Sequence, residues 1–194
     1  RYEHTWTESN QLTQRQISCS HYGRFYPTLH LNWQLKDNQN LAFAANWGIE
    51  RPDFNDLNPF RIYTSTTDYM TGNPYLTAAY TRNVEINYSN GKGLYAVLYN
   101  NYGKGETGWR TQFLKNGSQV TGPYDGLRHE KTGFYANYNR NVLTWLNLNI
   151  GGEVYYYDSH SDYRTDVLQV HGWGKRAEGS LSFMLNHQKT LIAE

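Results

Sequence analysis

Apolar and polar residues alternate along much of this 194-residue chain. In the run LAFAANWGI every second residue is apolar, from Leu41 to Ile49, so these side chains share one face of an extended strand. The preceding run, FYPTLHLNWQL, places leucines and a tryptophan on one side and polar residues on the other. The short polar link KDNQN joins the two runs, which together predict a β-hairpin.

Two more hairpins and a final strand follow the same pattern. Segments 84–88 and 94–98 alternate around the turn signal NGKG, segments 134–138 and 146–154 alternate around RNVLT, and segment 177–186 alternates as a last strand. From strict alternation we predict an apolar side that carries Leu31, Trp33, Phe43, Trp47, Leu148, Ile150 and Phe183. We predict that the other side carries Asn32, Asn46, Asn147, Glu153 and Ser182.

The spacing of the predicted tight turns indicates the architecture. The turns fall about 50 residues apart, near Asn38, Gly91, Val142 and Gln188. Long polar connections rich in aromatic residues lie between them, over 51–79, 103–130 and 159–172. Outer-membrane barrels have short turns at one rim and long loops at the other. The pattern therefore predicts an all-β fold: an antiparallel meander that forms part of a large transmembrane β-barrel. With a partial strand at 2–7, it supplies about eight strands of a wall that closes with about 22 in plugged transporters.

Composition supports a barrel wall and excludes several other classes. Aromatic residues make up 16% of the chain, although its mean hydropathy is only −0.81. No run approaches the roughly 18 apolar residues of a membrane-spanning helix, whereas a wall with a polar lumen has a low average hydropathy. The formal charge of +1 gives no reason to expect nucleic acid. The one cysteine, Cys19, excludes an internal disulfide, and we interpret its polar surroundings as a loop.

The most specific segment of the sequence runs from Trp47 to Ser89. It contains an arginine–proline pair, a leucine–asparagine–proline–phenylalanine run and a glycine–asparagine–proline–X–leucine turn, formed by Arg51, Pro52, Leu57, Asn58, Pro59, Phe60, Gly72, Asn73, Pro74 and Leu76. In order and spacing the segment resembles the outer membrane protein β-barrel family of Bacteroidetes-type TonB-dependent receptors. It departs from the family at Ala78 and Ala79, where proline and glutamate are usual. We interpret the motif as architectural, because proline cannot donate to a central ladder and fixes the backbone at turns.

The resemblance implies a wall segment of a TonB-dependent receptor in the bacterial outer membrane, which captures and imports a nutrient ligand. The partners that it implies are outer-membrane lipid, the ligand, a plug domain and the TonB energy-transducing system. No plug, TonB-contacting box or barrel-terminal strand ending in an aromatic residue is found in the sequence. We therefore expect residues 1–194 to be a single fragment of the barrel domain. The reading predicts no enzymatic activity, no nucleic-acid partner and no cofactor.

Several residues are candidates for binding. Aromatic residues in the long connections can contact a ligand outside the cell, and we select Tyr63, Tyr69, Trp109 and Tyr124. We assign Trp47 and the run Tyr155, Tyr156 and Tyr157 to an aromatic girdle at the membrane interface, in preference to a sugar-stacking platform. The pattern Asp158, His160 and Asp162 has metal-ligand chemistry, but we interpret it as a solvated loop, because no further ligand can be placed near it.

Two other functions compete with the receptor wall. A soluble β-sandwich that binds carbohydrate through exposed aromatic residues would bury the apolar side of each strand against a second sheet. A barrel wall would instead turn that side outward as a band about 25 Å tall. An enzyme built on a barrel would need a clustered nucleophile and base, which the sequence does not show.

Overall fold

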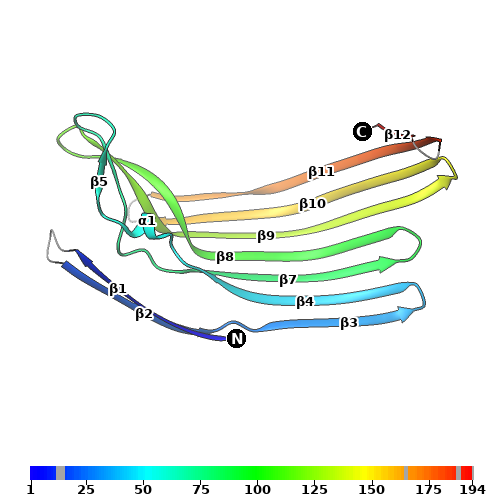
Figure 1. Ribbon diagram of the computed structural model, residues 1–194, viewed down its shortest axis with the longest axis horizontal. Helices are drawn as coiled ribbons and strands as arrows, with labels where there is room; N and C mark the ends of the chain where they lie inside the picture. The colour runs from blue at the N-terminus through cyan, green and yellow to red at the C-terminus, as the bar shows by residue number, and fades with distance from the viewer. Residues whose placement is uncertain (12–15, 164–165, 187–188, 194) are drawn as a thin grey trace.

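The computed structural model describes residues 1–11, 16–163, 166–186 and 189–193. A single antiparallel sheet dominates it, and the strands follow the order β12-β11-β10-β9-β8-β7-β4-β3 across the sheet (Figure 1). The strands of this path are β3 (Thr28–Lys36), β4 (Gln39–Glu50), β7 (Ala79–Asn90), β8 (Leu94–Phe113), β9 (Gln119–Leu143), β10 (Leu146–Tyr163), β11 (Asp166–Asn186) and β12 (Lys189–Ala193). Strands adjacent in the sequence are therefore adjacent in space, as in the predicted meander.

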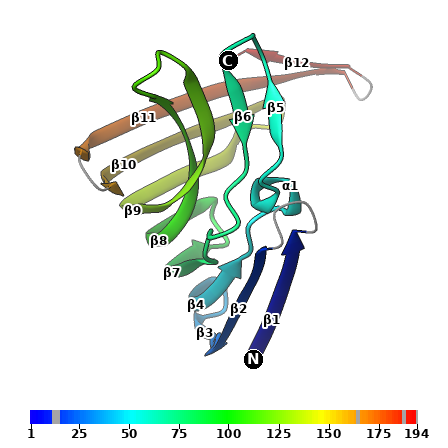
Figure 2. The ribbon, with the colours of Figure 1, turned by 90° about the vertical axis from the view of Figure 1, so that its left-hand side faces the viewer.

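The sheet is curved (Figure 2), and its two faces differ in chemistry. Cross-strand pairing joins apolar residues in a row across six strands: Leu31, Phe43, Ile86, Leu98, Phe134 and Val154. Side chains of this row belong to the convex face, and their neighbours along each strand belong to the concave face. The pairings place Trp33, Trp47, Leu148, Ile150 and Phe183 with the convex row and the predicted polar residues on the opposite face. The predicted facing is confirmed.

Little of the described chain is buried. The buried apolar side chains are Tyr26, Ala45, Leu76, Ala78 and Ala79. Large apolar residues of the convex face stay exposed, including Leu31 at 57%, Trp33 at 67% and Trp173 at 72%. No second sheet covers this face within the described residues, which is the arrangement of a wall and not of a sandwich. No helix in that part of the chain is long and apolar enough to span a membrane.

The tight turns gather at one end of the sheet. The turns after β3, β7 and β9 lie together on the right of Figure 1, as predicted near Asn38, Gly91 and Val142. In the second of them Asn90 Oδ1 accepts hydrogen bonds from the backbone N–H groups of Lys92 at 3.1 Å and Leu94 at 2.9 Å. The predicted turn near Gln188 lies outside the described residues.

The opposite end holds the long connections, but two of the three predicted loops are strands. Residues 103–130 form extensions of β8 and β9 that turn through Asn116 and Gly117. Residues 159–163 and 166–172 belong to β10 and β11, which pair with each other along this stretch. Sequence reasoning read these stretches as loops because strands that rise above the lipid can be polar on both faces, which removes the alternation. The turn signal at Asn116 and Gly117 did indicate the first extension, and Gly117 has the expected positive φ of 83°.

The N-terminal residues also differ from the prediction. In place of a partial strand at 2–7, β1 (Tyr2–Gln11) and β2 (Gln16–Phe25) form a separate antiparallel hairpin. Cys19 is therefore an exposed residue of β2, paired with Glu8, and does not lie in a loop. Both strands are strongly polar, so alternation gave no signal there. β2 continues through Tyr26 and Pro27 into β3, at the end that carries the long connections (Figure 1).

Residues 51–79 are the one predicted connection that is a true excursion from the sheet. It contains the short helix α1 (Phe54–Leu57) and the strands β5 (Arg61–Tyr63) and β6 (Tyr69–Thr71). In Figure 2 these elements lie inside the curve of the main sheet. β6 pairs in parallel with β9, at Tyr69 with Val120 and at Met70 with Thr121. The excursion therefore rests on the β8–β9 extension, over the concave face.

Candidate functional site

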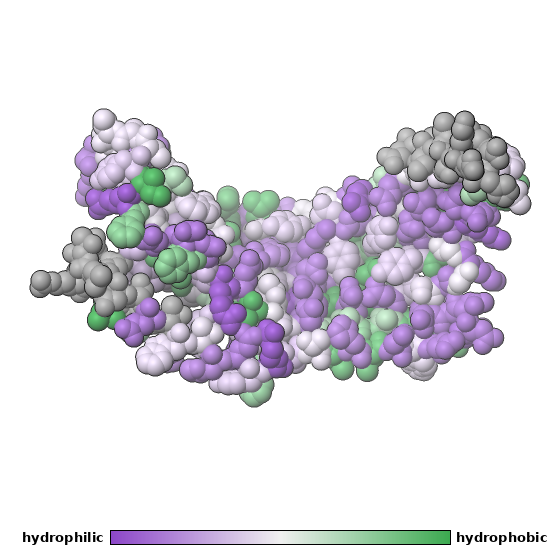
Figure 3. Space-filling model, in the orientation of Figure 1, coloured by the Kyte–Doolittle hydropathy of each residue, from purple (hydrophilic) through white to green (hydrophobic). Residues whose placement is uncertain are grey.

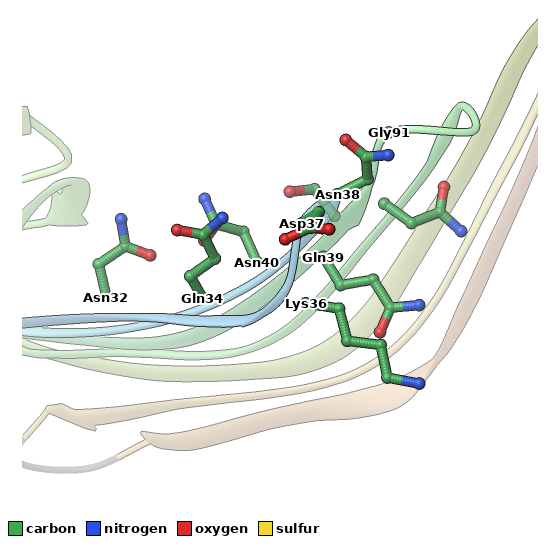
Figure 4. A pocket seen from close by; sticks show the side chains of 10 residues that line it. Asn32, Gln34, Lys36, Asp37, Asn38, Gln39, Asn40 and Gly91 are labelled. Carbon is green, nitrogen blue, oxygen red and sulfur yellow. The ribbon is translucent and has the colours of Figure 1, made fainter.

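The concave face is polar over most of its length, and Figure 3 shows it as mainly hydrophilic. Amide side chains pair between strands near the tight turns; Asn137 Nδ2, for example, donates to Asn149 Oδ1 at 2.8 Å. A hollow of about 570 Å³ at this end is lined partly by Asn32, Gln34 and Asn40, which stand on the concave side of β3 and β4 (Figure 4). Uncharged amides can both donate and accept hydrogen bonds, which suits a face turned toward a water-filled lumen.

A charged cluster lies on the concave face of the middle strands. Glu153, on β10, accepts a hydrogen bond from the Tyr99 hydroxyl on β8. Lys131 Nζ, on β9, lies 3.0 Å from Glu153 Oε1, and Arg176 Nε, on β11, lies 3.9 Å from Glu153 Oε2. Four neighbouring strands thus converge on one carboxylate. Arg176 Nε also lies 4.0 Å from Glu178 Oε2, so the two cations and two carboxylates of the cluster balance one another.

Tyr155 extends this cluster toward the long connections. The Lys131 Nζ lies 3.9 Å from the centroid of its ring, within the range of a cation–π interaction. The ring lies against Gly174 of β11, where an added Cβ would be 2.1 Å from Tyr155 Cζ. Only glycine leaves room for the ring in this position. Sequence reasoning missed Lys131 and Gly174; the available signal was the GWG run, which puts two glycines on one face of a strand.

The concave face near the long connections holds a second polar group. His129 Nδ1 lies 2.8 Å from Glu106 Oε2, and the rings of His129 and Tyr157 stack at 6.4 Å between centroids. Beside them is a hollow of about 510 Å³ at the base of the excursion. It is lined by Glu50, Arg51, Pro52, Asp53, Asp56, Ala79, Glu106 and Thr107. This end of the concave face therefore combines open space, carboxylates and ring surfaces.

A girdle requires side chains on the convex face, and only part of the tyrosine run lies there. Tyr156 belongs to the convex face, where its ring meets that of Trp173 at 5.4 Å between centroids. Trp47 is on the convex face as well. Tyr155 and Tyr157 alternate with Tyr156 and therefore line the concave face. The three residues were assigned together from their proximity to a strand end, although period two sends the middle one to the other side.

The family-like motif is held by hydrogen bonds between its two halves. Asp53 Oδ1 accepts from the Asn55 N–H at 2.8 Å and caps α1. The N–H of Gly72 donates to the Asn58 carbonyl at 2.9 Å, and the N–H of Asn73 donates to the Asp56 carbonyl at 2.6 Å. These bonds join the end of α1 to the segment that follows β6, so the excursion is a closed, structured unit.

The other motif residues lie around this junction. Leu57 ends α1, and the Phe60 N–H donates to Asn58 Oδ1 at 3.3 Å. The Pro59 carbonyl accepts a hydrogen bond from Thr71 Oγ1 at 3.1 Å. Pro74 is half-buried and Leu76 is buried. Asn73 Nδ2 donates to the Pro123 carbonyl of β9 at 3.4 Å. Asp125, also on β9, accepts from the Thr77 N–H at 3.0 Å and from its hydroxyl at 2.6 Å. These contacts tie the excursion to the β8–β9 extension.

Arg51 links the motif to the N-terminal hairpin. Its Nη2 atom donates to Glu3 Oε2 at 2.5 Å and to Thr5 Oγ1 at 3.2 Å, and both acceptors lie on β1. The hydrogen bond from Arg51 holds the pKa of the Glu3 carboxyl below its ordinary value. The arginine of the motif therefore connects two elements that share no sheet.

The four predicted binding aromatics lie at the same end of the sheet but do not form one site. The rings of Tyr63 and Tyr69 pack together on β5 and β6, with centroids 5.6 Å apart, and Arg61 lies 4.8 Å from the Tyr69 centroid. Trp109, on β8, is 54% exposed. The Tyr124 hydroxyl, on β9, lies 3.5 Å from Ser161 Oγ on β10. The sheet thus presents a pair of tilted tyrosine rings and an exposed indole, while the Tyr124 hydroxyl lies against the neighbouring strand.

Asp68 fixes the tip of the excursion against the β8–β9 hairpin. Its Oδ1 atom accepts from the Gln119 N–H at 2.9 Å and from Thr67 Oγ1 at 3.2 Å. The backbone hydrogen bond from Gln119, followed by a bond with Ser65, lowers the pKa of Asp68 from its ordinary value of 3.8.

The pattern of Asp158, His160 and Asp162 lies in β10 and not in a loop. Asp158 and His160 fall on the convex face, and Gln169 Nε2 donates to Asp158 Oδ1 at 3.2 Å. The side chain of Asp162 lies outside the described part. No group of three or more metal-ligating side chains occurs among the described residues.

Comparison with known proteins agrees with this architecture. Residues 1–194 match the outer membrane protein beta-barrel family. No curated protein matches the chain significantly.

Two solved structures share the fold. The siderophore receptor PirA from Pseudomonas aeruginosa aligns with a TM-score of 0.58 and 13% identity, covering 91% of this chain and 39% of that receptor. A mutant of the ferric enterobactin receptor PfeA from the same organism aligns with a TM-score of 0.52 and 13% identity, covering 91% of this chain and 35% of that receptor. The chain thus spans less than half the length of either receptor.

Proposed function

From the premise that the chain belongs to the outer membrane protein beta-barrel family and lies in the outer membrane, we propose that it is a wall segment of a TonB-dependent receptor that captures and imports a nutrient ligand. The observation that carries the proposal is the division of one sheet into an exposed apolar convex face and a polar concave face. At one end the excursion 51–79 and the β8–β9 extension 103–130 form a structured unit that we call the mouth. The convex face suits lipid, and the concave face suits a hydrated path.

The mouth supplies the means of ligand capture. Tyr63, Tyr69, Trp109 and Tyr124 come from three segments that are joined by β6–β9 pairing and by the hydrogen bonds of Asn73 and Asp125. Loops and extensions that rest on a rigid sheet can vary without loss of the fold, whereas lipid-facing positions must stay apolar. Specificity therefore belongs to the mouth. Siderophores are one ligand class to test, because PirA, a solved structure with this fold, is named a siderophore receptor. Glycans and peptides are others.

A plug domain and the TonB system are the partners that the proposal requires. The charged cluster at Glu153 supports a plug contact, because its side chains lie on the concave face where an inserted domain would meet the wall. Binding of carbohydrate by a soluble sandwich is disfavoured, because nothing in the described chain covers the convex face.

The test is a graft of residues 51–79 and 103–130 onto a related receptor of different specificity, followed by uptake measurements with both ligands. The proposal expects the preference to move with the graft. A recipient that folds, as judged by heat-modifiable migration in electrophoresis, but keeps its own preference would contradict it. Alanine at Tyr63, Tyr69 and Trp109 in the intact receptor should lower ligand affinity, while alanine at Thr28 on β3 should not.

A further inference from the structure

Three cations gather on the convex face at the end that carries the mouth. Lys104 of β8 pairs directly with Arg128 of β9, and Arg82 of β7 pairs with Tyr102, two residues along β8 from Lys104. The guanidinium carbons of Arg82 and Arg128 lie 5.3 Å and 5.6 Å from the centroid of the Tyr102 ring. We call Arg82, Lys104 and Arg128 the basic patch. It faces away from the concave surface and therefore away from the path proposed for the ligand.

Among the described residues, Lys104 and Arg128 have no anionic partner. Like charges directly opposite each other across an antiparallel pair destabilise a sheet. The ion pairs found among the described residues do not include either side chain, and both are exposed. Glu130, the nearest acid along β9, accepts from Asn100 Nδ2 at 2.9 Å and lies 3.9 Å from Arg82 Nη2. An anion placed between Lys104 and Arg128 would replace this repulsion by two attractions.

The height of the patch on the wall indicates which anion it meets. The apolar band begins on β8 at Leu94, beside the tight turn, and Lys104 lies ten residues further on. At about 3.3 Å per residue and a strand tilt of about 40°, ten residues rise by about 25 Å, which is the height of the apolar band of an outer-membrane barrel. The patch therefore lies at the outer edge of the hydrocarbon, at the depth of the lipid headgroups. Tyr102, which is beside it, is an aromatic residue suited to that interface.

We propose that the basic patch binds the phosphate of an outer-leaflet lipid headgroup, with Lys104 and Arg128 as the two principal contacts and Arg82 as an adjacent one. Lysine contributes a compact charge, and arginine contributes a planar fork that suits phosphate oxygens. The inference rests on the outer-membrane location and is independent of the identity of the imported ligand.

Native mass spectrometry of the intact receptor in detergent tests this proposal, with lipid A that carries two phosphates as the probe. The double variant Lys104→Gln/Arg128→Gln should bind the lipid roughly tenfold to thirtyfold more weakly, as expected for two cations at about one interfacial contact each. The matched control is Lys92→Gln/Lys115→Gln, which removes the same charge at the tight-turn end and at the tip of the β8–β9 hairpin. It should bind as the natural protein does.

A second measurement separates lipid binding from a structural role. In detergent without added lipid, Lys104→Gln/Arg128→Gln should unfold at the same temperature as the natural protein or at a higher one, since the repulsion is removed. Added lipid A should then raise the unfolding temperature of the natural protein more than that of the variant. Equal binding by both proteins would overturn the proposal. So would full competition by inorganic pyrophosphate at equal concentration, because the site would then be one for free anions.

Discussion

Gly72 offers the sharpest test of the structured mouth. A Cβ at this position would lie 2.3 Å from the Asn58 carbonyl oxygen and 2.6 Å from that of Asp56, and both are backbone atoms that cannot rotate away. The substitution Gly72→Ala must therefore separate two segments of the excursion. These are the same segments that the bonds from Gly72 to Asn58 and from Asn73 to Asp56 hold together.

The size of the effect follows from this geometry. Contacts of a real Cβ below 3.0 Å are essentially never seen. The Gly72–Asn58 bond of 2.9 Å must therefore lengthen by about 0.7 Å, which takes it out of hydrogen-bonding range. Loss of two backbone bonds at about 1 kcal/mol each gives a local cost of about 2 kcal/mol. Local opening of the excursion should then become about thirtyfold more frequent.

Limited proteolysis of the intact receptor measures that opening. We expect cleavage within 51–79 to be about thirtyfold faster in Gly72→Ala, with a smaller amount of folded barrel recovered from the membrane. Gly172→Ala is the matched control, because a Cβ there meets nothing within 4 Å. If Gly72→Ala is cleaved no faster than the control, the close packing of the excursion does not hold it together and the reasoning fails.

Three further predictions follow from the described contacts. Leu98→Arg, on the convex face, should lower the free energy of unfolding in lipid by about 2–4 kcal/mol. Val97→Arg, on the concave face at the same depth, should change that free energy little. Equal losses of stability would show that the faces are wrongly assigned. Gly174→Ala should lower the unfolding temperature by displacing the Tyr155 ring, but should not lower it in a Tyr155→Ala background. If the losses of the two single variants add in the double variant, the two residues do not interact. The folded protein lowers the pKa of Asp68 below its ordinary value of 3.8, so the hydrogen bonds of the ionised carboxylate stabilise the mouth at pH values above 3.8. This stabilisation is lost as the pH falls from 3.8 through the lower pKa of the folded state. Amide exchange at Gln119 should therefore rise in that acidic range in the natural protein but show no such step in Asp68→Asn.

The sequence predicts the fold well wherever one face of a strand meets lipid. Strict alternation in 28–49 and 146–154 sets the facing of Leu31, Phe43 and Ile150, and the NGKG signal locates a tight turn. Prediction fails where both faces of a strand meet water. β1, β2 and the upper parts of β8 to β11 are paired strands, with two register shifts between β8 and β9. Their polar sequences read as loops because hydrogen bonding between backbones leaves no mark on the side-chain pattern.

The candidate site was predictable only in part, for a related reason. The position of Tyr63, Tyr69 and Trp109 at the mouth follows from the connections that contain them. The contacts that organise the concave face do not, because Lys131, Glu153 and Tyr99 lie on three different strands and meet only through register. A shift of one residue in any of these strands would send its member of the cluster to the lipid side. Cross-strand register is determined by the whole sheet, so no single strand sequence contains it.

The run from Val154 to Tyr157 shows how one strand can serve lipid, lumen and interface at once. Val154 belongs to the apolar row and Tyr156 meets Trp173 on the convex face, while Tyr155 lies beneath Lys131 on the concave face. A tyrosine is acceptable on either side, because its ring suits the membrane interface and its hydroxyl suits a polar lumen. Residues at alternate positions can therefore change for a new ligand without altering the lipid-facing surface. This independence of the two faces allows a wall of fixed architecture to carry different mouths. It is why we assign ligand specificity to the mouth and lipid recognition to the basic patch.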